Sequence, residues 1–381
     1  MKFIVNSQLF TKQLQAMSSV LTNNNTVPII TCILFQMEGK TLSMRATDLE
    51  TTVVSTLDLE TASDDGVKEV AIPAKLLLDA VKTLSDAPVT IAVDNNFSVE
   101  LTCGDGKYTL AGQNGATFPS LPPVEDTSST TIMASALVAA INKTLFAAST
   151  DEMRQQMSGI FFDFTTERMT VVATDAHKLV RYRRTDVKAS EDVSFIVPKK
   201  PLNVVKNIIA GSKDDVEVSM EYNTTNVSLS FANFRVVCRL VDGRYPNYEL
   251  AIPKDNPNHL MVERAELMTA LRRVALFANK ATQQVRFSIS DQDLTISAED
   301  IEFSNNGKDK VACHYEGNPM EIGFSAKFLL EMLNNLDTER IRIEMSHPNM
   351  AGIIYPQIDE ESETPNPEDL LMLVMPMMLA N

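Results

Sequence analysis

The chain has 381 residues, enough for roughly two to four domains, and 44% of them are hydrophobic, as in ordinary globular proteins. No apolar run approaches the roughly 18 residues that a membrane span needs, and residues 1–6 turn polar too early for a signal peptide. The four cysteines have no CxxC spacing, so we expect free thiols in a reducing compartment and a cytoplasmic protein. The formal net charge of −16 at first argues against nucleic acid, because phosphate contacts need Lys and Arg.

A short pattern occurs three times in the chain, at residues 41–48, 168–175 and 293–300. The aspartates that end the three copies are separated by 127 and 125 residues. In each copy apolar residues alternate with other residues, which predicts a strand buried on one face. An interval this long exceeds the roughly 20–50 residues of a solenoid repeat, so the repeated unit is a whole domain. The sequence therefore predicts three related domains.

Each copy also predicts two amphipathic helices, because apolar residues recur at intervals of three and four. Pro stands close to the first turn of two of them, where its missing N–H costs nothing. The expected helices cover, in chain order, residues 8–22, 74–85, 133–149, 199–210, 262–280 and 325–336. Between the helices the period changes to two and turn residues appear, so each copy reads as strand, helix and three strands, twice. The predicted fold class is α+β, with two helices packed on antiparallel sheets in each domain.

Pro and polar residues gather between the copies, at residues 118–131 and 244–257, and indicate the domain boundaries. The expected domains are residues 1–122, 128–250 and 251–381. Within the third domain, residues 359–369 are too acidic and too rich in Pro to pack, so we expect a solvated loop there.

Charge is unevenly distributed between the helices and the rest of the chain. The six helical segments hold 12 Lys and Arg against four Asp and Glu, so the remainder of the chain carries −24. If the helices share one side of each domain, that side is basic on an acidic protein. Such a face would hold phosphates without sequence preference. The alternative is that exposed helix faces are often rich in Lys without any role.

With this threefold unit and this charge distribution, the chain resembles the bacterial DNA sliding clamps, the beta subunits of DNA polymerase III. The resemblance covers essentially the full length. It rests on segments at residues 1–3, 27–29, 46–50, 172–179, 240–248, 321–324 and 374–377. It implies a non-catalytic processivity factor without metal or cofactor, in which two chains join head to tail as a closed ring. Helices line the hole around duplex DNA and sheets form the outside. The implied partners are double-stranded DNA, a second copy, DNA polymerase subunits, the clamp loader and other proteins with a clamp-binding peptide, but no membrane.

The resemblance also implies a cleft between the second and third domains that accepts a short partner peptide with apolar anchors. The matching positions are Met157, Thr174, Ala176, His177, Lys178, Leu179, Pro246, Leu373, Val374, Met375, Pro376, Met377 and Leu379. Met side chains adapt to varied ligands, which suits such a cleft. The alternative is that residues 374–379 form an ordinary core strand. Leu250 and Met378 stand where many relatives carry Arg, and residues 380–381 extend past the usual end, so peptide preference is expected to differ.

Two further sets of residues are expected to face DNA or the second copy. The DNA-facing set joins helix cations with loop residues that match by resemblance: Lys12, Asn24, Lys75, Lys82, Lys143, Arg154, Gln155, Gln156, Lys199, Lys200, Lys206, Arg272, Arg273 and Lys327. The dimer contact is expected to join Tyr108 and Leu110 on a strand of the first domain to Leu276 and Phe277 at a helix end of the third. Core packing is the alternative for these four residues.

An enzyme is the less favoured interpretation. Asp175 and His177 suggest a hydrolase in the cleft between domains, yet no G-x-S-x-G, Walker A, GxGxxG or HExxH motif is present. Cys313 and His314 are adjacent and have no second pair, which argues against zinc. A third interpretation is an oligomeric scaffold that is not a clamp.

Overall fold

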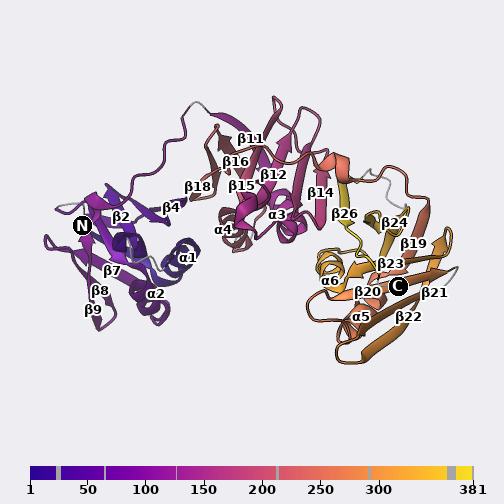
Figure 1. Cartoon of the computed structure of the whole chain (residues 1–381). Coiled ribbons are helices and arrows are strands. Elements are labelled where there is room, and N and C mark those ends of the chain that lie inside the picture. Colours follow the sequence, from indigo (N-terminus) through magenta and orange to yellow (C-terminus); the bar gives the residue numbers. More distant parts are fainter. Residues whose placement is uncertain are drawn as a thin grey trace. The chain divides into compact units, whose positions relative to one another are not determined.

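The computed structural model describes residues 1–22, 27–63, 66–125, 127–211, 214–290, 293–357 and 366–379 (Figure 1). The chain divides into two compact units, and the second repeat contributes to both of them. The first unit joins Met1–Val138 with Val197–Val241, and the second joins Ala139–Ile196 with Asp242–Asn381. Asn24, residues 359–365 and residues 380–381, which carried expectations from the sequence, lie outside the described residues.

The first repeat has the predicted order of elements, strand, helix and strands, twice over. Its elements are β1 (Lys2–Asn6), α1 (Ser7–Ser18), η1 (Pro28–Thr31), β2 (Cys32–Glu38), β3 (Thr41–Thr47), β4 (Thr51–Asp58), β5 (Thr61–Ser63), β6 (Glu69–Pro73), α2 (Ala74–Lys82), β7 (Pro88–Val93), β8 (Ser98–Cys103), β9 (Gly106–Ala111), β10 (Gln113–Asn114) and η2 (Gly115–Thr117). Asn6 caps α1 by accepting hydrogen bonds from the backbone N–H groups of Gln8 and Leu9. Helices α1 and α2 pack side by side in this repeat (Figure 1).

The second and third repeats follow the same order. The second contains β11 (Ser128–Met133), α3 (Ala134–Thr144), η3 (Leu145–Ala147), η4 (Glu152–Met157), β12 (Gly159–Phe164), β13 (Met169–Thr174), β14 (Lys178–Arg184), β15 (Val193–Pro198), α4 (Lys199–Ala210), β16 (Glu217–Tyr222), β17 (Asn226–Phe231) and β18 (Phe234–Arg239). The third contains η5 (Tyr248–Ala251), β19 (Asn258–Glu263), α5 (Arg264–Ala275), β20 (Gln284–Ser290), β21 (Asp293–Asp300), β22 (Asn305–Glu316), β23 (Met320–Ser325), α6 (Ala326–Asn334), β24 (Arg340–Met345), β25 (Gly352–Gln357) and β26 (Glu368–Val374). The predicted α+β class and the doubled order within each repeat are confirmed.

The strands pair in the same way within and between repeats. Three sheets run β5-β1-β7-β8-β9, then β10-β6-β2-β3-β4-β18-β17-β16-β11, and β15-β12-β13-β14-β26-β25-β24-β19-β22-β21-β20-β23. The last strand of the second repeat, β18, pairs antiparallel with β4 of the first. The last strand of the third repeat, β26, pairs antiparallel with β14 of the second. A backbone ladder therefore joins consecutive repeats.

The three copies of the repeated pattern are the strands β3, β13 and β21, and one of them departs from expectation. β3 and β21 alternate between buried and more exposed residues, as predicted. All six residues of β13 are buried, so the prediction of a strand buried on one face is wrong there. The ring of Tyr245 stacks at 4.7 Å on Phe161, the register partner of Val172. The segment between repeats thus covers the second face of β13.

Two further expectations concern the helices, namely the Pro residues near their first turns and the absence of a membrane span. Pro73 and Pro198 occupy the N-cap positions of α2 and α4, as predicted from their place near the first turn. In the described ranges, none of the helices is both long and apolar enough to cross a membrane.

Candidate functional site

The turn between β13 and β14, residues 174–178, is built by its own side chains. Asp175 Oδ1 accepts hydrogen bonds of 2.9 Å from the backbone N–H groups of both His177 and Lys178. Thr174 Oγ1 donates to the carbonyl of Lys178 at 2.7 Å and accepts from the N–H of Ala176 at 3.1 Å. Ala176 has φ +75°, which this turn imposes on the residue before His177.

The first repeat builds the same turn, so the repeated Thr-Asp pair has a structural role. Asp48 Oδ1 accepts from the N–H groups of Glu50 at 3.0 Å and Thr51 at 2.6 Å. Thr47 Oγ1 donates to the carbonyl of Thr51 at 3.0 Å, and Leu49 has φ +82°. The shared motif therefore shapes the loop, and what is special to the second repeat is the residues that surround it.

A buried lysine joins this turn to the third repeat. Lys178 is only 6% exposed, and its Nζ lies 2.9 Å from Asp175 Oδ2 and 3.0 Å from Glu331 Oε2 on α6. The same ammonium lies 4.6 Å from the ring centre of Phe328, which also stacks with His177 at 6.1 Å. Phe328 and Glu331 were not among the predicted site residues. Their signal in the sequence was weak, because Glu331 is the one acidic residue of that helix and Phe328 is one of its several apolar residues.

The C-terminal segment runs from this turn to the third repeat. Lys178 and Leu179 pair with Val374 and Leu373 in the β14–β26 ladder. The N–H of Met375 donates to the carbonyl of His177 at 2.9 Å. The N–H of Met377 then donates to the carbonyl of Gly323 at 2.8 Å. A Cβ added to Gly323 would lie only 2.5 Å from the carbonyl oxygen of Met377, so this close approach requires glycine.

These contacts sort the predicted cleft residues into a floor and a surface. The buried members are Thr174, Lys178, Leu179, Leu373 and Val374, so they form the floor of any cleft. Ala176, His177 and Met375 are exposed, and Met157, Pro246, Pro376, Met377 and Leu379 are half-buried. A polar hollow of about 880 Å³ over the third repeat shares Leu379 with this set. The structure thus brings the 174–179 turn together with the C-terminal segment, while Met157 lies at the end of η4 and Pro246 follows the Tyr245 that covers β13.

The same geometry gives no catalytic pair. Both oxygens of Asp175 are engaged, one by backbone N–H groups and the other by Lys178. Within the described residues, no hydrogen bond joins the His177 ring to Asp175, and the ring stacks on Phe328 instead. A general base needs an orienting partner within hydrogen-bond reach. In the same part of the chain, no group of three or more His, Cys, Asp or Glu residues is placed to hold a metal ion.

The predicted DNA-facing residues also fall into two groups. Several already have partners: Lys200 binds the carboxylate of Asp48 and the carbonyl of Val20, and Arg273 lies 2.6 Å from Asp309. Lys143 lies 3.7 Å from Asp337 and 3.5 Å from Glu368.

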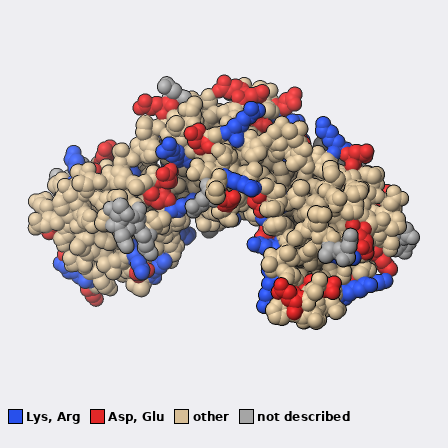
Figure 2. Space-filling model, viewed as in Figure 1, with Lys and Arg blue, Asp and Glu red and all other residues tan. Residues whose placement is uncertain are grey.

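Two arginines of this set also have partners. Arg154 lies 3.5 Å from Asp151, and Arg272 donates a hydrogen bond to Asn334. Lys199 and Lys206 are half-buried, and Gln155 and Gln156 are exposed. The exposed cations that form no ion pair with any described residue are Lys12, Lys75, Lys82 and Lys327. On the face seen in Figure 2, Lys and Arg are interspersed with Asp and Glu, so that face carries no patch of a single sign.

The four residues expected at a dimer contact lie beside open strand edges. β9, which holds Tyr108, pairs only with β8 among the described strands. Tyr108 is exposed, but Leu110 is buried in the core of its own sheet, so only its backbone faces the edge. Phe277 packs over Gly307 of β22, and a Cβ added to Gly307 would lie 2.6 Å from the Phe277 ring. The neighbouring Leu276 is 82% exposed.

Comparison with known proteins places the whole chain in one family. Models of the DNA polymerase III beta subunit match its N-terminal domain at residues 1–122, its central domain at residues 131–247 and its C-terminal domain at residues 249–368. A beta sliding clamp from Pseudomonas aeruginosa is 28% identical over 381 residues, the full length of both chains. One from Vibrio cholerae is 27% identical over 95% of this chain and 97% of its own.

Solved structures agree. The crystal structure of a sliding clamp from Pseudomonas aeruginosa bound to griselimycin covers both chains completely, with a TM-score of 0.92 and 26% identity. The beta subunit from Thermotoga maritima, at 24% identity, has the same fold with a TM-score of 0.90 over the full length of both chains.

Proposed function

Because the chain belongs to the DNA polymerase III beta subunit family and is a sliding clamp of that polymerase, we propose that two copies close head to tail into a ring around duplex DNA. The protein is a non-catalytic processivity factor. Its work is to tether polymerase to DNA in the cytoplasm. In this proposal residues 1–122, 128–250 and 251–381 are the three ring domains of each copy.

The observation that carries the ring is the ladder between repeats. At both internal junctions, the fourth strand of one repeat pairs with the last strand of the next, as β4 with β18 and β14 with β26. The corresponding strands left over are β22 of the third repeat and β9 of the first. Along Asn305–Ala312, β22 pairs only with β21 among the described strands, because β19 joins it from Cys313 onward.

A second copy would complete both open edges with the ladder that the chain already uses twice. Such a contact joins different surfaces of the two copies, and a heterologous contact whose rotation closes gives a ring. An open strand edge offers unpaired N–H and C=O groups with which a strand of another chain can pair. Tyr108 and the pair Leu276 and Phe277 would then pack beside the new ladder, where their exposed apolar area is removed from water.

DNA would be held by cations that the chain itself leaves free. Lys75, Lys82 and Lys327 all lie on helices, where the excess of basic residues was found. Contacts to phosphates carry no sequence information, which suits a clamp that must slide. Lys143 and Lys200 contribute less to this lining, because their charges are already matched by carboxylates.

Polymerase subunits, the clamp loader and other partners would bind the cleft formed by the 174–179 turn and residues 375–379. The support is that an exposed His177 lies beside exposed and half-buried Met side chains, along a segment held by backbone hydrogen bonds and by the amide of Gln284, which donates to the carbonyl of Met378. Exposed apolar side chains on such a fixed segment are typical of a peptide-binding site.

A retention assay on circular DNA tests the ring. The full-length protein is loaded on nicked circular plasmid with its clamp loader and ATP, and the plasmid is then cut once. The ring predicts that bound protein survives gel filtration on the circle and is lost after the cut. Protein that stays on linear DNA with free ends would exclude a sliding ring.

The cleft is tested separately with a variant that ends at Val374. It is expected to form the dimer, but to be loaded poorly by the clamp loader and to lose stimulation of DNA synthesis. Unchanged stimulation would contradict the proposed cleft.

A further inference from the structure

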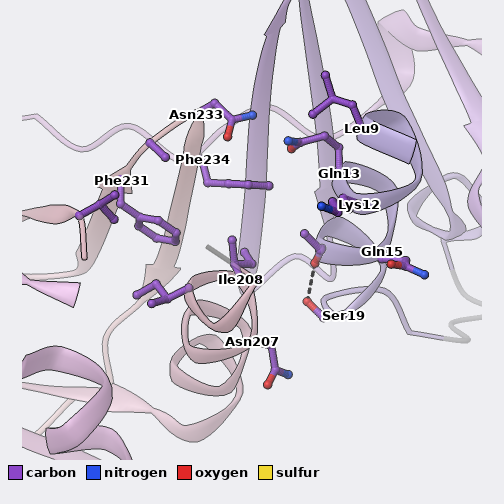
Figure 3. Close-up of a pocket in the computed structure, with 15 residues that line it drawn as sticks. Leu9, Lys12, Gln13, Gln15, Ser19, Asn207, Ile208, Phe231, Asn233 and Phe234 are labelled. Atoms are coloured by element: carbon purple, nitrogen blue, oxygen red, sulfur yellow. Dashed lines mark hydrogen bonds between the residues drawn. The ribbon is translucent and has the colours of Figure 1, made fainter. Parts of the chain in front are cut away.

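A hollow of about 450 Å³ lies at the junction of the first and second repeats, within the first unit (Figure 3). One side is α1, which carries Leu9, Gln13 and Lys12, and the other is the end of α4 with the β17–β18 turn. Phe234 extends from its strand toward α1, with Ile208 and Phe231 beside it (Figure 3). Most of the lining area therefore comes from apolar side chains. The volume lies within the range of roughly 300–1,000 Å³ that is usual for ligand sites.

The corresponding place at the junction of the second and third repeats is crossed by charged groups. There Lys143 of α3 lies 3.7 Å from Asp337, which follows α6, and 3.5 Å from Glu368 at the start of β26. The ammonium also lies 5.7 Å from the ring centre of Tyr182. These contacts tie the helix of one repeat to the helix and strand of the next.

The equivalent positions at the first junction are all Ala. Helices α1 and α3, like α4 and α6, start 127 residues apart, so Ala16 corresponds to Lys143 and Ala210 to Asp337. The ladders give the third equivalence. Glu368 pairs with Arg184, which corresponds to Leu57 of the first repeat. Continuing the β4–β18 register by two residues beyond Ser55 and Phe234 sets Leu57 opposite Ala232, the residue after β17, so Ala232 corresponds to Glu368. Ala16 and Ala232 line the hollow directly. The first junction therefore lacks all three charged side chains that cross the second.

One cation remains in the hollow without a carboxylate. Among the described lining residues, Lys12 alone is charged, and it forms no ion pair with any described residue. At the second junction the lysine is matched by two acids supplied by the chain. At the first, the described residues supply no carboxylate to Lys12, so its ammonium is free to pair with an acidic ligand.

We propose that this hollow is a second binding site, which takes a short segment of a partner protein carrying large apolar side chains next to carboxylates. The apolar side chains would lie against Ile208, Phe231 and Phe234, and a carboxylate would pair with Lys12. The exposed amides of Gln15 and Asn207 at the rim provide hydrogen bonds for the peptide backbone. This goes beyond the proposed ring and cleft, since it uses neither the open edges nor the C-terminal segment.

The test is a titration of the full-length protein followed by methyl NMR at Leu9, Ile208 and Ile209. The probe is acetyl-Leu-Phe-Glu-Glu-amide, with acetyl-Leu-Phe-Lys-Lys-amide and acetyl-Gly-Gly-Glu-Glu-amide as controls for charge and for apolar contact. The acidic apolar peptide is expected to shift these methyl signals saturably, and each control to bind at least about tenfold more weakly. Equal binding of the two apolar peptides, or no saturation, would overturn the proposal.

Variants locate the binding in the hollow. The double variant Ala16→Lys/Ala210→Asp rebuilds the ion pair of the second junction and should weaken binding at least about tenfold. Lys12→Glu, on an exposed side chain that does not threaten folding, should reverse the preference between acidic and basic peptides. Lys68→Glu, an equal charge change at an exposed position of the same repeat outside the hollow, should change nothing.

Two other outcomes would overturn the proposed site. If Lys68→Glu acts like Lys12→Glu, the effect is one of net charge and the site is excluded. If a short DNA duplex shifts these methyl signals more strongly than the acidic peptide does, the hollow is a DNA contact and the proposal fails. Because the titration uses neither loader nor plasmid, its failure leaves the proposed ring untouched.

Discussion

Lys178 on β14 and Glu331 on α6 form an ion pair of 3.0 Å that links the second repeat to the third. The lysine is almost completely buried, and Asp175 and the ring of Phe328 surround the rest of its ammonium. A buried charge of this kind is costly to leave unmatched. The pair therefore couples the turn at residues 174–178 to the position of α6.

Replacing Lys178 by Met should destabilise the protein by about 1–3 kcal/mol, because Asp175 and Glu331 lose their shared cation. Met keeps most of the aliphatic chain, so the loss reports on charge. Lys310→Met is the matched control, since Lys310 and Asp293 form an exposed pair of 3.2 Å that should contribute at most about 1 kcal/mol. Urea unfolding measures the loss of unfolding free energy in both variants. Equal losses would show that the buried ion pair stabilises the protein no more than the exposed pair does.

The open edges predict that Leu276→Asp separates the proposed dimer. The change places a carboxylate in an apolar contact and should weaken the dimer about a hundredfold or more. Leu250→Asp is the control, because Leu250 is 84% exposed and Leu276 is 82% exposed, yet Leu250 lies on η5 and not on either of the open strands. Sedimentation velocity over a concentration series distinguishes them. Unaltered self-association of Leu276→Asp would argue against this interface.

The two groups of helix cations should respond differently to substitution. Lys75→Ala and Lys327→Ala remove free charges, so each should reduce the salt dependence of DNA binding by about one counterion without lowering stability. Lys200→Ala should instead lower stability, because Asp48 loses its partner. Anisotropy titrations of a labelled duplex at several salt concentrations, together with unfolding midpoints, separate the two effects. The division fails if Lys200→Ala changes only the salt dependence.

Asp186 gives a prediction about pH. Its hydrogen bonds with Arg184, including one of 2.6 Å, hold the pKa of the Asp186 carboxyl below its usual range. A lowered pKa contributes stability above the unfolded pKa of about 3.9, and that contribution is lost as the pH falls through the folded value.

Asp186→Asn should therefore lower stability at pH 7 by at most about 1 kcal/mol, since the pair is partly exposed, and the difference from the parent should vanish in acid. Thermal unfolding across pH measures it. Asp79→Asn, at an exposed carboxylate of α2 with no ion pair to the described residues, is the control and should leave stability at pH 7 unchanged. A loss for Asp186→Asn that persists in acid would mean that packing, not charge, is responsible.

The order of elements could be predicted because it depends on local periodicity. Alternation in β3 and β21 and helical spacing in α1 are properties of neighbouring residues. The engagement of Lys143 by Glu368 is not, since these residues lie far apart in the sequence and meet only after β26 pairs with β14. The charge count treated Lys143 and Lys200 as free for that reason.

Burial at particular positions was also beyond the sequence. Tyr108 and Leu110 lie two residues apart on β9 and so share one face of the strand, yet Leu110 is buried and Tyr108 is exposed, a difference that depends on the neighbours which the fold supplies to each. The second face of β13 is covered by Tyr245 from a segment that looked only like a linker. The unexpected residues beside His177, Phe328 and Glu331, come from a helix of the next repeat.

The ladder between β14 and β26 has a consequence for synthesis of the chain. The second repeat can fold most of its strands once β15 to β18 have left the ribosome, but β14 then exposes an unpaired edge. Its partner, Glu368–Val374, is translated long after β14. Until this partner strand leaves the ribosome, the unpaired edge of β14 is open to pairing with strands of other nascent chains. We expect translation stalled before residue 368 to leave an aggregation-prone polypeptide, whereas the edge of β4 is already closed by β18 at that stage.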